Sequence, residues 1–199
     1  MSKVSLAGNA SGIGIFTIAS PNSNTDRTLT LPDNTGTLVT TASTGTVTQA
    51  MLASNVATNG PAFNAYRSTN QSVTSATWTK VEFNAEDFDT AGAYDASTNY
   101  RFQPLVAGYY SIQFAVACYS GAFTAVLARL YKNGSGTNIQ AFNYSATSNV
   151  LDDWGVSAST MIYMNGSTDY LEVYGFSISA TPEFNSGGTW FSGFLARSA

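Results

Sequence analysis

The sequence predicts an all-β fold, a sandwich or jelly roll, for residues 60–199. Apolar and polar residues alternate there in short runs, as in strands with one buried face. Turn signals separate these runs every 8–15 residues, and two of them are the Asn-Gly pairs at 133–134 and 165–166. Charged residues make up only 10% of the chain, which excludes a coiled coil and a charged disordered chain.

About eight strands follow one another in this region. The runs that indicate them are residues 78–83, 108–118, 125–132, 139–146, 156–164, 170–176 and 189–196. The run at 108–118 has the clearest alternation. One of its faces is large and apolar: Tyr110, Ile112, Phe114, Val116 and Cys118. The single cysteine, Cys118, is therefore predicted to be buried and inert.

The opposite face of the 108–118 strand is small and carries no charge. It presents Ser111, Gln113, Ala115 and Ala117. Interfaces within homo-oligomers are depleted of charge, so we predict that Ser111, Gln113 and Ala115 lie at a subunit interface. Exposure of this face to solvent is the alternative.

Residues 1–59 have a different composition and are predicted to form an extended, β-rich stalk or attachment segment. Phe16 is their one aromatic residue, and they carry four charges. Short β-like runs at 13–18, 28–31 and 37–40 need a partner for burial, and other copies of the chain would supply it. A capping box from Thr46 to Gln49 predicts a short helix ending near Val56. Asn59-Gly60-Pro61 then marks the boundary between an N-terminal segment, 1–59, and a head, 60–199.

Several functions are excluded or disfavoured by what the sequence lacks. There is no histidine and only one cysteine, so we expect no enzyme built on a His-dependent triad, no disulfide within the chain and no cofactor. The net charge is −4 without a basic run, so nucleic acid is not an expected partner. No apolar run reaches the roughly 18 residues of a membrane helix, and no signal peptide is present. We therefore expect synthesis in a cytoplasm and no membrane insertion.

Two groups of residues are candidates for binding. Asp87 and Asp89 lie in an acidic stretch that is spaced to offer oxygens to Ca²⁺, with an exposed acidic loop as the alternative. Aromatic residues beside Asn and Asp suit a glycan, because sugar rings have flat apolar faces. The candidates are Tyr119, Phe123, Tyr144 and Trp154. Their alternative role is to anchor loops.

Six short motifs in residues 61–199 resemble, in order, the globular head of the C1q family, whose jelly roll is shared with tumour necrosis factor-like proteins. The most specific is Phe102-Gln103-Pro104-Leu105-Val106-Ala107-Gly108-Tyr109-Tyr110. The others are Ala62–Arg67, Val81–Asn84, Ala93–Asp95, Lys132–Gly134 and Phe191–Leu195. The resemblance implies a homotrimer, with Phe191 as a further interface residue. No collagen repeat precedes the head, and the family's Gly-Asp turn is lengthened to Gly166-Ser167-Thr168-Asp169.

The N-terminal segment resembles the modular N-termini of bacteriophage fibre proteins. The similar stretches are residues 24–38 and 48–53. Together, the two resemblances imply a trimeric virion fibre or knob. Residues 1–59 would attach to another virion protein, and the head would bind a host-surface receptor, a glycan or a protein.

Three other functional classes are alternatives. One is a capsid decoration or head-fibre protein that docks on the shell through its N-terminus. Another is a bacterial surface or spore-coat protein with a C1q-like head. A polysaccharide-degrading tailspike is disfavoured, because the chain is short for a long β-helix and shows no convincing pair of catalytic carboxylates.

Overall fold

A computed structural model describes residues 11–15, 17, 22–26, 28, 51–52, 59–119, 123–149 and 153–199. The chain has two units, residues 1–40 and 41–199. In the first unit the described residues of the 13–18 run lie in no strand, and Ile13 and Ile15 are fully exposed. The pairing of this run with other copies of the chain stays a prediction. The predicted helix lies outside the described residues except for Met51 and Leu52. The boundary near residue 59 stays a prediction.

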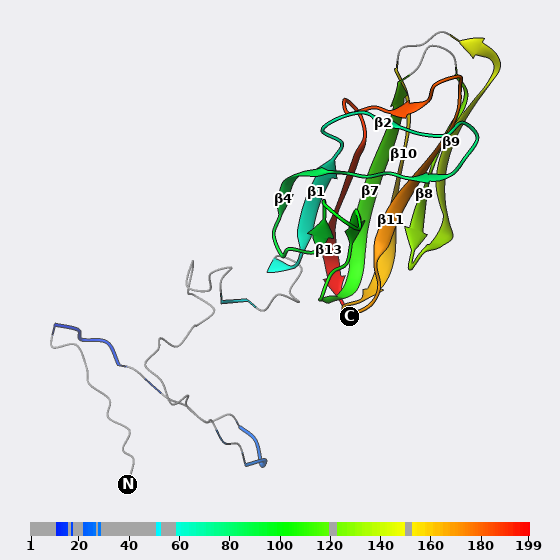
Figure 1. Cartoon of the computed structure of the whole chain (residues 1–199). Coiled ribbons are helices and arrows are strands. Elements are labelled where there is room, and N and C mark those ends of the chain that lie inside the picture. Colours follow the sequence, from blue (N-terminus) through cyan, green and yellow to red (C-terminus); the bar gives the residue numbers. More distant parts are fainter. Residues whose placement is uncertain are drawn as a thin grey trace. The chain divides into compact units, whose positions relative to one another are not determined.

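Residues 60–199 form two antiparallel β-sheets that pack face to face (Figure 1), which confirms the all-β sandwich. In the seven-stranded sheet the order is β2 (Gln71–Ser72), β12 (Glu183–Phe184), β7 (Ala107–Tyr119), β13 (Trp190–Ser198), β1 (Ala62–Tyr66) and β4 (Ala85–Asp89), with β10 (Asp153–Asn165) also paired to β7. In the six-stranded sheet the order is β5 (Tyr94–Asp95), β6 (Arg101–Phe102), β11 (Leu171–Ile178), β8 (Phe123–Lys132) and β9 (Ser135–Asn149), with β3 (Thr79–Lys80) paired to β11.

The core lies between the sheets, and β7 is its central strand. The side chains from Tyr110 to Cys118 at every second position are fully buried, as the alternation predicts. The Cys118 thiol is among them, and burial raises its pKa to about 12. A cluster of aromatic rings fills part of the core. Its members are Phe63, Phe83, Tyr94, Phe102 and Phe191. The described part of the chain contains no long apolar helix of the kind that spans a bilayer.

Two turns hold the ends of β8–β9 and β10–β11 together. Asn133 and Gly134 both have positive φ, 54° and 76°, so this Asn-Gly pair forms the tight hairpin turn that the sequence predicts. The Asn133 amide donates to the Asp169 carboxylate at 2.8 Å, and Lys132 pairs with the same carboxylate at 2.7 Å. Asn165 accepts the backbone N–H of Asp169 at 3.0 Å. The Lys-Asn-Gly motif and the lengthened Gly-Asp turn are therefore one hydrogen-bonded unit.

We expect Asp169→Asn to lower the free energy of unfolding by about 2 kcal/mol, because the Lys132 ammonium loses its partner beside a largely buried side chain. The Lys132 hydrogen bond holds the pKa of Asp169 below its usual value. The stability that it contributes is thus complete above the unfolded-state pKa of about 3.9 and is lost as the pH falls through the lower folded-state pKa. Urea unfolding from pH 7 to pH 2 measures this, and the variant should lose less stability below pH 4 than the natural chain. An equal acid loss in both proteins would contradict the assignment.

Candidate functional site

The acidic stretch on β4 uses its carboxylates to hold its own backbone. Asp89 accepts the backbone N–H of Ala91 at 3.0 Å and that of Tyr94 at 2.7 Å. Asp87 accepts the Asn64 amide at 2.7 Å. Within the described residues, no group of three His, Cys, Asp or Glu side chains is placed to hold a metal ion. Asp87 and Asp89 thus make edge and turn contacts, and calcium binding by them stays a prediction.

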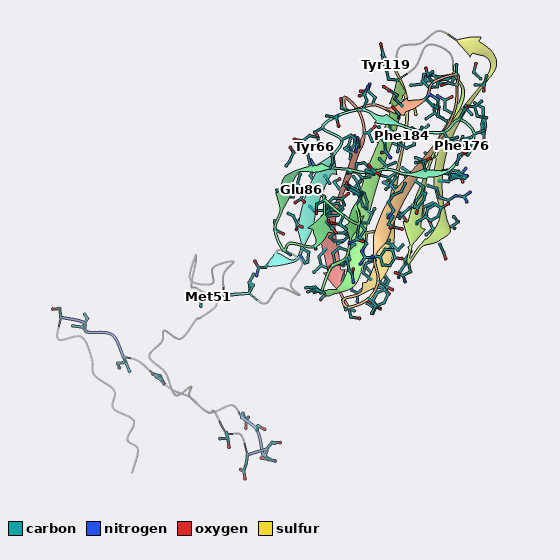
Figure 2. All side chains as sticks on the ribbon, viewed as in Figure 1. Met51, Tyr66, Glu86, Tyr119, Phe176 and Phe184 are labelled. Atoms are coloured by element: carbon teal, nitrogen blue, oxygen red, sulfur yellow. The ribbon has the colours of Figure 1, made fainter. Side chains whose placement is uncertain are left out.

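The outward face of the seven-stranded sheet is the larger of two candidate surfaces, and we call it the neutral face. It consists of Ala62, Asn64 and Tyr66 (β1), Tyr109, Ser111, Gln113, Ala115 and Ala117 (β7), Gly155, Ser157, Ser159, Met161 and Tyr163 (β10), and Trp190, Ser192 and Phe194 (β13). None of these sixteen residues is charged; charged side chains stand at the margin of the face, where Arg197 lies opposite Tyr109 and Asp87 of β4 contacts Asn64. Figure 2 labels Tyr66 on this sheet, beside Glu86 of the edge strand β4.

The strand register arranges the neutral face in rows of alternating character. One row joins Met161, Ser111, Phe194 and Ala62 across β10, β7, β13 and β1. Phe194 is 49% exposed and Met161 56% exposed. In a second row, Trp190 lies opposite Ala115. In a third row, Tyr109 lies against Tyr163, and their ring centroids are 5.5 Å apart. Large exposed side chains therefore recur across all of this face.

The polar row between them is already hydrogen-bonded within the face. The Gln113 amide donates to the Ser111 hydroxyl at 2.7 Å, and the Ser192 hydroxyl donates to the Gln113 carbonyl at 3.4 Å. Burying polar groups that keep their partners costs little, whereas burying unpaired ones is expensive. This face is thus suited to be covered by another protein surface.

Three of the predicted interface residues lie on this face, and one does not. Ser111, Gln113 and Ala115 point outward and are half-buried. Phe191 is fully buried in the aromatic cluster, 4.9 Å from the Phe63 ring in an edge-to-face contact. Its assignment as an interface residue was wrong, because Phe191 points inward on β13 while Trp190 and Phe194 point outward.

The outward face of the six-stranded sheet carries the second surface, which we call the aromatic patch. It consists of Phe142 and Tyr144 (β9), Phe176 and Ile178 (β11), and Trp78. Phe142 lies opposite Leu127 of β8, and Leu127 lies opposite Phe176, so the three side chains form one continuous row. Phe142 and Tyr144 are 66% and 63% exposed. Figure 2 labels Phe176 within this sheet.

The aromatic residues predicted to bind a receptor do not form one site. Tyr144 is in the aromatic patch, whereas Tyr119 is exposed at the end of β7 in the other sheet. Phe123 is fully buried, and Trp154 packs against the core, 6.2 Å from the Phe123 ring. Phe123 was therefore wrongly assigned as a contact residue, because β8 begins two residues earlier than predicted and turns its side chain inward.

Sequence reasoning missed Phe142, which is the most exposed aromatic side chain of the patch. The signal was present, because Phe142 and Tyr144 are two residues apart in a run predicted as a strand, which places them on the same face. The pairing of β8 with β11 brings Phe176 and Ile178 to the same surface. Trp78 joins them through its ring contact with Phe176. No pattern within one strand reveals that pairing.

Comparison with known proteins identifies the fold. No protein-family model matches the chain, and no curated protein matches it. Among solved structures, murine APRIL matches with a TM-score of 0.51 and 10% sequence identity, both in its pH 5.0 crystal and in its pH 8.0 crystal. Each match covers 68% of this chain and 98% of APRIL. The chain therefore has the jelly-roll fold of tumour necrosis factor- and C1q-like proteins.

Proposed function

We propose that this chain is a non-enzymatic structural protein that assembles as a homotrimer through its neutral face. The observation that carries the proposal is a sheet face of sixteen uncharged residues with Tyr109, Met161, Tyr163, Trp190 and Phe194 among them, all at least 36% exposed. A monomeric protein seldom leaves so many large apolar side chains together in water. In a trimer, three copies of this face meet around the threefold axis and cover one another with uncharged side chains.

The trimer is favoured over other assemblies by the fold and by the sequence resemblance. The jelly roll is of the tumour necrosis factor and C1q type, and C1q-like motifs run through residues 61–199. The resemblance implies three copies around one axis. Three heads then present three equal sites, and weak single sites gain avidity from simultaneous contact with a surface.

We further propose that the trimer is a fibre or knob of a bacteriophage particle. Residues 1–59 attach it to another virion protein, as their resemblance to phage fibre N-termini suggests. The head binds a receptor on the host surface. Support for this step comes from the aromatic patch, which lies on the opposite sheet from the neutral face and so stays open when the neutral face is covered.

The experiment is immunogold labelling of the parent particle with an antibody raised against residues 61–199. We expect label at the tail or at fibre tips. Label spread over the capsid would replace the receptor-binding role with that of a decoration or head-fibre protein. Label on no particle would overturn the virion assignment and favour a cellular surface or spore-coat protein. Release of oligosaccharides from host-surface polysaccharide by the pure chain would overturn the non-enzymatic assignment.

A further inference from the structure

A positioned arginine borders the aromatic patch. Arg129 lies on β8, in the row next to Leu127 and Phe142, and its side chain is half-buried. Its guanidinium donates from Nε to the Gln140 side-chain carbonyl at 2.8 Å, and its Nη2 donates to the same oxygen. It also lies over the Trp78 ring, 5.1 Å from the centroid. Arg129 is thus held in place by one neutral partner and one ring.

In the described part of the chain, Arg129 has no acidic partner, unlike three of the head's other cations. Arg67, Lys80 and Lys132 each have a carboxylate within 4.0 Å. Within the described residues, no carboxylate lies that close to Arg129. A guanidinium has five N–H donors, and Gln140 engages two of them, so three remain for a ligand.

Arg129 is an added positive charge on this sheet, where Arg101 lies opposite Asp95 and their charges offset one another. The carboxylate of Glu172 on the same face is neutralised by Lys80 at 2.5 Å. The acidic residues Glu86, Asp87 and Asp89 belong to β4, at the edge of the other sheet. Arg129 therefore gives the aromatic patch one uncompensated positive charge, to which an anionic group is complementary.

We propose that Arg129 and the aromatic patch together bind an acidic saccharide, a sugar chain that carries carboxylates. Arginine recognises a carboxylate through paired, charge-assisted hydrogen bonds. Phe142 and Tyr144 offer exposed rings on which the apolar faces of sugar units stack. The inference names the ligand class of the receptor-binding head, so it rests on the proposed function.

The dimensions of the surface suit a chain of sugars better than a single small molecule. Gln140, Phe142 and Tyr144 occupy alternate positions on one face of β9 and span about 13 Å, at 3.3–3.4 Å per residue. Arg129 lies opposite Gln140, at one end of this stretch of β9, and the exposed rings of Phe142 and Tyr144 come next along the strand. A linear polysaccharide laid along β9 thus meets the cation at one unit and the rings at the next.

The test measures binding of the full chain to four carboxylated polysaccharides: polygalacturonate, alginate, hyaluronan and polysialic acid. Dextran and methyl-esterified polygalacturonate are the neutral controls, and polyglutamate is the peptide control. We expect binding to at least one of the four acids by isothermal titration calorimetry. Arg129→Gln should weaken it about tenfold or more, because one charge-assisted contact is lost. Phe142→Ala should weaken it by a similar factor, about tenfold.

Arg101→Gln is the matched control. Arg101 is also on the six-stranded sheet and also lies over a ring, that of Tyr170 at 4.4 Å, but it belongs to β6 and not to the aromatic patch. The substitution Arg101→Gln removes the same charge as Arg129→Gln. It should change the affinity less than about twofold, because only long-range attraction is lost. Equal losses in Arg101→Gln and Arg129→Gln would overturn the site, and so would an absence of binding to all four acids. Equal affinity for polyglutamate, or for the neutral esters, would overturn the ligand class.

The outcomes separate this inference from the proposed function. A trimer that labels fibre tips but binds none of the four acids contradicts the acidic-saccharide site alone. A monomeric chain that binds one of them through Arg129 contradicts the trimer alone. Light scattering on the same samples distinguishes the two cases.

Discussion

Phe194→Lys is expected to convert the trimer into monomers that remain folded. Phe194 is 49% exposed in the single chain and lies between Ser111 and Ala62 in a row without charge. In the trimer, each interface would then enclose an ammonium in a row that holds no carboxylate. Such a charge costs about 3 kcal/mol per interface, roughly a hundredfold in each dissociation constant. Sedimentation velocity at several chain concentrations measures the result.

The matched control is Phe142→Lys. It makes the same substitution on a more exposed side chain, 66%, in the other sheet. The trimer should persist in this variant, with a sedimentation coefficient equal to that of the natural chain. If Phe142→Lys dissociates the protein while Phe194→Lys leaves it intact, the subunits meet through the aromatic patch and the neutral face has another role.

Phe191→Ala is expected to lower the free energy of unfolding by about 3–5 kcal/mol, the usual cost of removing a phenyl ring from a packed core. Phe191 is fully buried and contacts the rings of Phe63, Phe83 and Tyr94 at centroid distances of 4.9, 5.6 and 6.1 Å. Removal leaves a cavity between the two sheets. Urea unfolding at a fixed chain concentration measures the loss, because the midpoint of an oligomer depends on concentration.

For this second variant, Phe142→Ala serves as the control, and its stability should stay within about 0.5 kcal/mol of the natural chain. Phe191→Ala should also keep the trimer mass while it is folded. The contrary outcome is a variant that is as stable as the natural chain but sediments as a monomer. That result would show that Phe191 is an interface residue and that its inward direction is wrong.

The long strands could be predicted because the alternation of apolar and polar residues within each strand indicates which face is buried. In β7 the alternation from Tyr110 to Cys118 shows which face is apolar, and the structure buries that face. In β13 the alternation does not distinguish the buried face from the exposed one. Phe191 and Leu195 alternate with Trp190 and Phe194, and both pairs are apolar. Only the pairing with β7, where Phe191 lies opposite Phe114, determines which side is inward.

Short elements and composite surfaces could not be predicted from local pattern. The strands β2, β5, β6 and β12 have two residues each, too few to show a period, and they exist because a longer neighbour offers backbone partners. The predicted strand at 78–83 is regular only at Thr79–Lys80, although Val81 and Phe83 are buried as the alternation requires. The aromatic patch combines residues from three distant segments, and Arg129 joins it through a cross-strand pairing with Gln140.

The measurement that tests the account most directly is the mass of the natural full-length chain by multi-angle light scattering. One chain is 21.0 kDa. If three chains assemble through their neutral faces, the measured mass should be three times that value and should not change on dilution. A mass of 21.0 kDa at every concentration would contradict the account, because the sixteen uncharged residues of the neutral face would then face water.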